Sequence, residues 1–83
     1  MIKVLFFAQL AETAETRSVC VDQSSVISVR DLAELATANL PSGLRQELFD
    51  GTVMVAVNKK RADWETSVAS GDEVAFLPPF SGG

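Results

Sequence analysis

The sequence predicts an α+β fold in which one main helix covers one face of a mixed β-sheet. Four short apolar segments have the composition and the alternation that are typical of β-strands. One amphipathic helical segment lies between the second and the third of them. The length of 83 residues allows one hydrophobic core, so we expect these elements to form a single domain.

The N-terminal part of the chain contains two predicted strands. Residues 2–8 are rich in β-branched and aromatic side chains, which favour a strand. The polar segment 9–16 is expected to be a loop, in which residues 11–14 could form a helical turn. Residues 17–21 alternate in the manner of a second strand, and residues 22–25 form a polar turn.

The main helix is expected to begin at Ser28. Residues 28–31, Ser-Val-Arg-Asp, resemble a capping box with aspartate in place of the usual glutamate or glutamine. Pro41 and Gly43 are expected to end this helix, and residues 44–49 predict a second, short one. One apolar stripe recurs at helical spacing along the main helix: Val29, Leu32, Ala33, Ala36 and Leu40.

The C-terminal half supplies the remaining strands. Residues 53–57 alternate valine with other apolar residues, which predicts a strand. Residues 58–61, Asn-Lys-Lys-Arg, form a predicted turn, and residues 61–64 are expected to add a short edge strand. A Gly-Asp turn then leads into the final strand, residues 73–77.

This order of elements, β-β-α-β-β, predicts the β-grasp architecture, the ubiquitin-like roll. The first and last strands are the most apolar, so we expect them to be parallel neighbours at the centre of the sheet. Because side chains alternate along a strand, one set is expected to face the helix: Val4, Phe6, Val19, Val21, Val53, Val55, Val57, Val74 and Phe76. The opposite set is expected to face outward: Leu5, Phe7, Met54, Ala56, Ala75 and Leu77. Such an exposed apolar patch is expected to dock a partner; the alternatives are that the chain's own loops cover it or that the two faces are reversed.

Composition and charge exclude several classes of function. The net charge of −4 argues against nucleic-acid binding, which needs a basic surface. The chain has no histidine, the commonest general base and metal ligand. The single cysteine, Cys20, cannot form an internal disulfide or a metal centre, and in a strand it is expected to act as a small hydrophobe and not as a reactive thiol. We therefore expect no bound metal or cofactor.

No segment has the features of a secretory leader or of a membrane span. The apolar run at residues 2–7 has no basic leader and no cleavage site. No apolar run approaches the roughly 20 residues that cross a bilayer. We expect a cytoplasmic protein with no membrane partner.

The last six residues, 78–83, read Pro-Pro-Phe-Ser-Gly-Gly and predict an extended tail behind a domain of residues 1–77. Proline lacks the amide hydrogen of a strand ladder, so pairing is expected to stop at about Leu77. Gly82 and Gly83 have no side chain, so this tip could pass through a narrow channel. A frayed chain end is the alternative. Gly-Gly behind a Pro-Pro stem favours a tail whose terminal carboxylate is the reactive group.

Three segments carry a resemblance to a known family. They are residues 3–8, Lys-Val-Leu-Phe-Phe-Ala, residues 56–58, Ala-Val-Asn, and the C-terminal block 71–83. Together they resemble the ubiquitin-like sulfur carriers, and most closely the MoaD family, the small subunits of molybdopterin synthase. The resemblance covers the full length. The C-terminal block is the most specific part, since the thiamin-pathway carriers share Gly-Gly but usually lack the Pro-Pro stem.

The resemblance implies a chemistry for the tail. An E1-like adenylyltransferase (MoeB-like) would use ATP to adenylate Gly83, and sulfur would then replace AMP to give a thiocarboxylate. Gly82 and Gly83 would carry this sulfur into the large molybdopterin synthase subunit (MoaE-like) of a heterotetramer. There a cyclic pyranopterin precursor becomes the dithiolene of molybdopterin, so this chain donates sulfur and is not catalytic alone. The residues expected to bind the partner are Leu5, Phe7, Met54, Ala75, Leu77, Pro78, Pro79 and Phe80.

Two alternatives remain open for the function. The chain could carry sulfur for another pathway, such as that of thiamin or the tungsten cofactor. It could also be a ubiquitin-like interaction module whose tail is never activated. Lys59, Lys60 and Arg61 are interpreted as a solvated turn, with contact to an acidic partner as the alternative.

Overall fold

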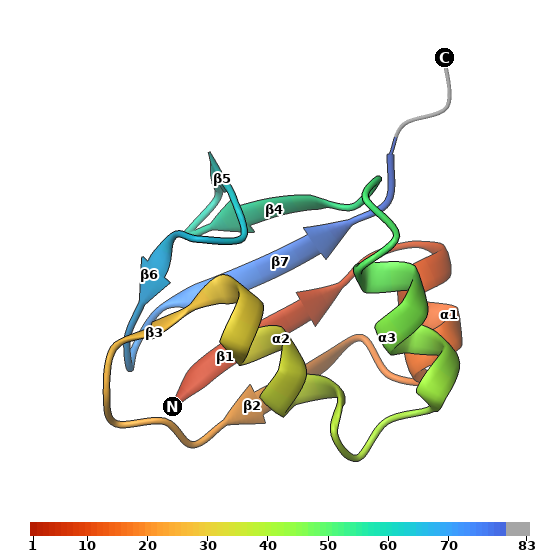
Figure 1. Cartoon of the computed structure of the whole chain (residues 1–83). Coiled ribbons are helices and arrows are strands. Elements are labelled where there is room, and N and C mark those ends of the chain that lie inside the picture. Colours follow the sequence, from red (N-terminus) through yellow and green to blue (C-terminus); the bar gives the residue numbers. More distant parts are fainter. Residues whose placement is uncertain (80–83) are drawn as a thin grey trace.

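A five-stranded mixed sheet forms the framework of the fold (Figure 1). The computed structural model describes residues 1–79, and residues 80–83 lie outside the described residues. The sheet has the strand order β2-β1-β7-β4-β5, and β3 pairs with β6 in a separate two-stranded sheet. Along the chain the elements are β1 (Ile2–Phe6), α1 (Gln9–Ala14), β2 (Ser18–Val21), β3 (Ile27–Ser28), α2 (Val29–Thr37), α3 (Ser42–Leu48), β4 (Met54–Val57), β5 (Lys60–Ala62), β6 (Ser67–Val68) and β7 (Glu73–Leu77).

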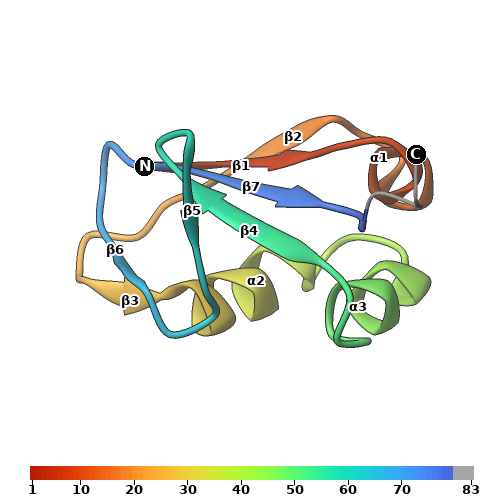
Figure 2. The same ribbon diagram turned by 90° about the horizontal axis from the view of Figure 1, so that it is seen from above.

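The two central strands, β1 and β7, are parallel, as the sequence predicts. In their register Val4 lies beside Val74 and Phe6 beside Phe76. β2 pairs antiparallel with β1 on one side, and β4 pairs antiparallel with β7 on the other. Figure 2 shows α2 and α3 on one side of this sheet. The β-grasp prediction is therefore confirmed, with three helices in place of the two expected.

Burial alternates along the central strands and confirms the predicted orientation of the sheet. Val4, Phe6, Val74 and Phe76 are buried on the side that the helices cover. The remaining members of the inward set are also buried or packed against the core: Val19, Val21, Val53, Val55 and Val57. The opposite face of the same strands is left for other contacts.

The start of α2 follows the predicted capping pattern, but its end does not. The Ser28 side chain accepts a hydrogen bond from the Asp31 backbone N–H at 3.1 Å. The helix ends at Thr37, whose hydroxyl donates to the Ala33 carbonyl at 2.8 Å. Four members of the predicted apolar stripe are buried: Val29, Leu32, Ala33 and Ala36. The fifth, Leu40, lies beyond the end of the helix and is partly exposed, but it packs against the core.

The prediction that Pro41 and Gly43 end α2 was wrong. Pro41 is the N-cap residue of α3, and Gly43 lies inside α3. Proline suits the start of a helix because the first N–H groups have no partner within the helix. The predicted short helix is confirmed, and it begins two positions earlier than expected, at Ser42.

Residues 9–16 are more regular than the predicted loop, because they contain α1. Leu10 and Ala14 of this helix are buried, which gives it an anchor in the core. Ala8 at the N-cap has a φ of 52° and Glu15 at the C-cap has a φ of 61°. The reversal at Ala8 also ends β1 at Phe6, two residues before the predicted end.

The β4–β5 connection is a tight hairpin. Asn58 and Lys59 have φ values of 50° and 69°, the positive pair that a type I′ turn needs. Asn58 also accepts a hydrogen bond from the Glu73 backbone N–H at 3.0 Å and donates one to Asp72 at 3.1 Å. The predicted edge strand is confirmed as β5, but it begins at Lys60, so Lys60 and Arg61 belong to a strand and not to the turn.

The carboxylate of Asp72 fixes the turn before β7, and it yields a prediction for acid pH. A hydrogen bond from the Ala69 backbone N–H, and one from the Asn58 side chain, lower the pKa of Asp72. Because the pKa of Asp72 is lower in the folded chain than in the unfolded chain, the ionised carboxylate stabilises the fold at pH values above the unfolded-state pKa. This stabilisation is lost as the pH falls through the folded-state pKa. We expect Asp72→Asn to be less stable than the parent above about pH 4, with the difference shrinking below it. Urea unfolding at several pH values measures this, and a difference independent of pH would contradict it.

Candidate functional site

The end of β7 is where the predicted tail begins. β7 ends at Leu77, as expected, and the half-buried Pro78 and the exposed Pro79 follow. Neither proline can donate to a strand ladder. The predicted reactive residues Gly82 and Gly83, and the predicted contact Phe80, lie outside the described residues.

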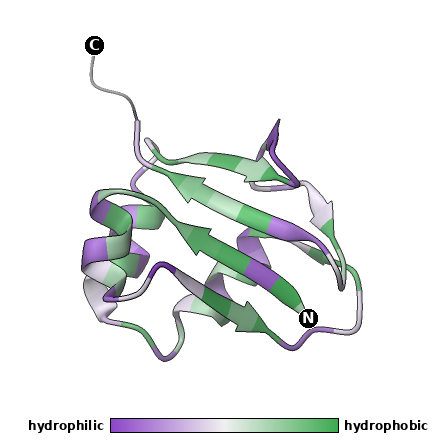
Figure 3. Cartoon of the chain, turned by 180° about the vertical axis from the view of Figure 1, so that it is seen from behind, coloured by the Kyte–Doolittle hydropathy of each residue, from purple (hydrophilic) through white to green (hydrophobic). Residues whose placement is uncertain are grey.

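One apolar surface lies beside this stem, on the face of the sheet opposite α2. Register places Leu5 beside Ala75, Ala75 beside Ala56, and Leu77 beside Met54, so these side chains are neighbours on three adjacent strands. Figure 3 views this face directly, and no helix crosses β7 or β4 there. The outer patch is defined here as the six residues predicted to face outward: Leu5, Phe7, Met54, Ala56, Ala75 and Leu77.

Exposure within the outer patch is uneven. Phe7 is 44% exposed, whereas its neighbour Phe6 is 2% exposed. The other five members are partly exposed. The Phe7 backbone N–H donates to the Phe76 carbonyl at 3.3 Å, which holds this residue next to the end of β7. The structure therefore brings the outer patch and the proline stem together, while their role in binding stays a prediction.

The other end of the same face is polar. Lys3 of β1 lies in register with Glu73 on one side and with Cys20 on the other. Cys20 is an exposed free thiol, so the expectation that it packs as a small hydrophobe was wrong. The predicted strand is present as β2, but it lies at the edge of the sheet. Its outward side chains, including that of Cys20, are therefore not covered.

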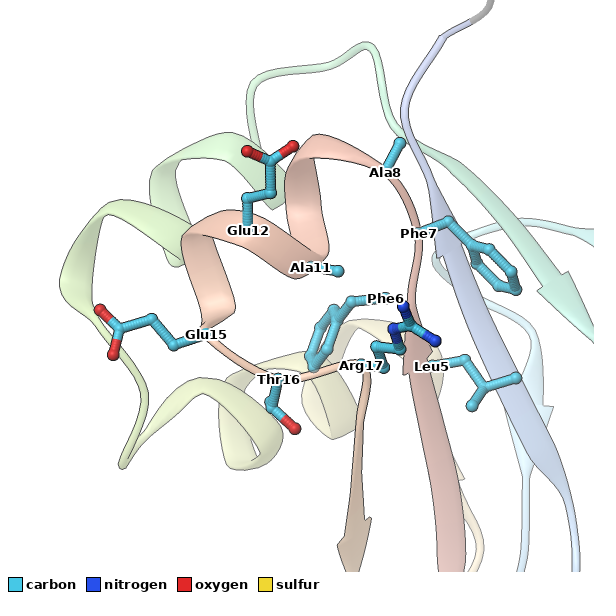
Figure 4. A pocket seen from close by; sticks show the side chains of 9 residues that line it. All are labelled: Leu5, Phe6, Phe7, Ala8, Ala11, Glu12, Glu15, Thr16 and Arg17. Carbon is cyan, nitrogen blue, oxygen red and sulfur yellow. The ribbon is translucent and has the colours of Figure 1, made fainter.

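A pocket of about 710 Å³ opens between α1 and the end of β1 (Figure 4). It shares Leu5 and Phe7 with the outer patch, and Arg17 lines it from the start of β2. The remaining lining residues are Phe6, Ala8, Ala11, Glu12, Glu15 and Thr16. Sequence reasoning missed Arg17 as a surface residue of this site, because the pocket depends on α1, which was expected to be a loop.

The basic segment of the β4–β5 hairpin divides between the turn and the strand. Lys59 lies in the turn, as predicted, and Lys60 and Arg61 open β5. All three side chains are exposed. Arg61 lies in register with Ala56 of the outer patch, which places it on the same face.

The described residues offer surfaces for contact. Within residues 1–79, no group of three cysteine, aspartate or glutamate side chains is placed to hold a metal ion. No helix in this part of the chain has the length and apolar character of a membrane span. The site that the structure assembles is thus an apolar face, a pocket beside it and a proline stem that leads to the Gly-Gly end.

Comparison with known proteins agrees with this arrangement. A family model described as the ThiS family matches residues 4–83. The chain is 39% identical to the molybdopterin synthase sulfur carrier subunit of Escherichia coli and 32% identical to that of Haemophilus influenzae, in each case over the whole of both chains. It is also similar to the crystal structure of SAMP1 from Haloferax volcanii, with a TM-score of 0.81, 33% identity, and 99% and 98% of the two chains covered. The chain therefore belongs to the ThiS/MoaD family of ubiquitin-like β-grasp proteins.

Proposed function

We propose that this chain is the sulfur carrier subunit of a molybdopterin synthase and acts in the cytoplasm. The observation that carries the proposal is the similarity to two sulfur carrier subunits of molybdopterin synthase over the entire length of all three chains. The match of the family model extends through Gly83, the residue whose carboxylate would carry the sulfur.

The proposed chemistry solves a problem of reactivity at Gly83. A carboxylate resists attack because the leaving group would be oxide. An E1-like adenylyltransferase (MoeB-like) would use ATP to convert it to an acyl adenylate, releasing pyrophosphate. A sulfur nucleophile would then displace AMP and leave a thiocarboxylate. Two carriers would serve each product, because a dithiolene contains two sulfur atoms.

The described residues would supply the docking part of this reaction. The outer patch would bind the large subunit (MoaE-like), and the Pro78-Pro79 stem would direct the tail toward its active site. Gly82 and Gly83 would then enter without a side chain to obstruct the passage. Because the chain has no histidine, the acid–base groups and the pocket for the pterin would belong to the partner.

Intact mass spectrometry tests the proposal at its central step. After incubation with the activating enzyme, ATP and a sulfur donor, the mass is expected to show one oxygen replaced by sulfur at Gly83. Omission of ATP serves as the control, since adenylation must precede sulfur transfer. An unchanged mass, with the activating enzyme shown to form adenylate on another substrate, would refute the carrier function.

A second candidate function is attachment of the chain to other proteins. The observation that favours it is the similarity to the Haloferax volcanii protein named small archaeal modifier protein 1 (SAMP1), which is 36% identical to this chain. Conjugates of higher mass, joined through the tail to lysine side chains, would indicate this role.

A different test distinguishes the proposed carrier from carriers of the thiamin or tungsten-cofactor pathways. Copurification with a large molybdopterin synthase subunit would identify the chain as the molybdopterin synthase carrier.

A further inference from the structure

We propose that Arg17 and Arg61 bind carboxylates at the rim of the partner surface that docks on the outer patch, and that they select this partner. The inference rests on the proposed function, which supplies the partner. It adds the charge pattern that the partner's rim must carry.

The two arginines border the outer patch at opposite edges of the sheet. Arg17 precedes the edge strand β2, and in Figure 4 its side chain extends toward β1. It lines the same pocket as Leu5 and Phe7. Arg61 lies in the other edge strand, β5, and lines a second hollow, of about 320 Å³, together with Met54. Arg17 therefore shares a hollow with two members of the outer patch, and Arg61 shares one with a single member, Met54.

In the part of the chain that the structure describes, neither guanidinium takes part in a side-chain ion pair. Within residues 1–79 the side-chain ion pairs are Arg30–Glu65 and Arg45–Glu34, which involve neither Arg17 nor Arg61. In Figure 4 the side chains of Glu12 and Glu15 extend away from Arg17, although they border the same pocket. The contact of Arg17 with β1 is made by its backbone carbonyl, which accepts from the Phe6 N–H at 2.9 Å.

The position of these cations contrasts with the charge of the whole chain. The net charge is −4, which by itself would favour a basic partner. On this face, however, Glu73 lies at the far end and is in register with Lys3. Charges at the rim act over about one Debye length, roughly 8–10 Å, so the nearest groups decide which contacts form.

The partner that fits has an apolar centre and carboxylates on two sides. A guanidinium is planar and binds a carboxylate through two parallel hydrogen bonds. Two such contacts, one at each edge of the sheet, fix the orientation of the partner as well as its identity. Charged groups at a rim mainly affect the association rate and its dependence on salt.

Charge reversal tests the inference. Arg17→Glu, Arg61→Glu and the double variant are compared with Lys59→Glu, which makes the same change in net charge in the hairpin turn. Affinity for the large subunit is measured by calorimetry at low and high salt. We expect each arginine reversal to weaken binding about tenfold at low salt and to reduce its salt dependence, while Lys59→Glu binds like the parent. Circular dichroism verifies the fold, and Arg17→Gln and Arg61→Gln replace any variant that does not fold.

Three results would overturn the inference. The first is unchanged binding of the double variant, and the second is an equal loss with Lys59→Glu, which would indicate a general effect of charge. The third is tighter binding of the reversed variants, which would show that the partner's rim is basic. If the parent chain itself fails to bind the large subunit, the proposed function is wrong and the inference falls with it. Loss restricted to the arginine variants, with the parent binding, supports both.

Discussion

Phe6→Glu is expected to unfold the domain, whereas Phe7→Glu is expected to leave it folded. Phe6 is 2% exposed, and its ring centroid lies 6.1 Å from that of Phe76 in the core. Removing a buried phenylalanine costs about 3–5 kcal/mol, and an unpaired carboxylate at the same place adds to this loss. A typical domain is stable by about 5–15 kcal/mol, so a chain of this size has little reserve. Urea unfolding followed by circular dichroism measures the effect.

The same substitution at Phe7 is expected to affect the partner instead. Phe7 is 44% exposed and belongs to the outer patch, so the free domain can solvate a carboxylate there. In the complex the introduced carboxylate of this variant would be buried without a counter-charge, which costs about 2–5 kcal/mol. Affinity for the large subunit should therefore fall by a factor of about thirty or more. Calorimetric titration measures this, and Phe7→Leu, which keeps an apolar side chain, should bind nearly as well as the parent.

The pair of variants also tests the assignment of the sheet faces. Phe6 and Phe7 are adjacent, so the substitutions are chemically identical and differ only in the direction of the side chain. If Phe7→Glu unfolds the chain and Phe6→Glu leaves it intact, the two faces are reversed. If both fold and both bind, the outer patch is not the docking surface.

Gly82→Val is expected to stop sulfur transfer without altering the fold. Gly82 lies outside the described residues and beyond β7, which ends at Leu77, so we expect the domain to fold without a contribution from this position. A β-branched side chain stiffens the backbone and widens the tip that, in the proposed function, would enter the partner. Misplacement of a reacting group by about 1 Å can cost a hundredfold in rate, so we expect a loss of at least about this size.

The measurement separates entry into the partner from formation of the thiocarboxylate. Single-turnover sulfur transfer is followed with chain that already carries sulfur, as established by intact mass, and circular dichroism verifies the fold. Gly82→Ala is the graded control, because one methyl group should obstruct the passage less than two. Transfer by Gly82→Val at the rate of the parent would contradict the argument from a narrow passage.

The sequence alone was enough to predict the sheet, because β1 and β7 are its most apolar strands, and the larger or β-branched residues at alternate positions of β7 indicated its inner face. Val4 and Phe6, with Val74 and Phe76, repeat every second position and are buried as expected. The helix start at Ser28 was also predictable, since its side chain has a specific hydrogen-bonding role.

Other features depended on information that is not local. α1 begins at Gln9, after the N-cap residue Ala8, whose φ of 52° is unusual for alanine. No glycine stands at this position to indicate the turn in the sequence. β3 and β6 have two residues each, too few for any periodicity. Pro41 was interpreted as a stop for one helix when it starts the next. The position of Arg17 at the pocket could not be recognised without α1, because residues of that helix also line the pocket.

β7 is the last strand to be synthesised, yet it lies between β1 and β4 in the sheet and is followed directly by the tail. β1 is synthesised early, but its parallel neighbour begins only at Glu73, so the two hairpins β1–β2 and β4–β5 stay unjoined until β7 arrives between them. Contacts between segments so distant in sequence form late in folding, because the intervening chain must first be closed into a loop. The proline stem is anchored only once β7 is in place. In the proposed function, a partner that binds the outer patch and the stem together would therefore bind completed molecules and not incomplete ones.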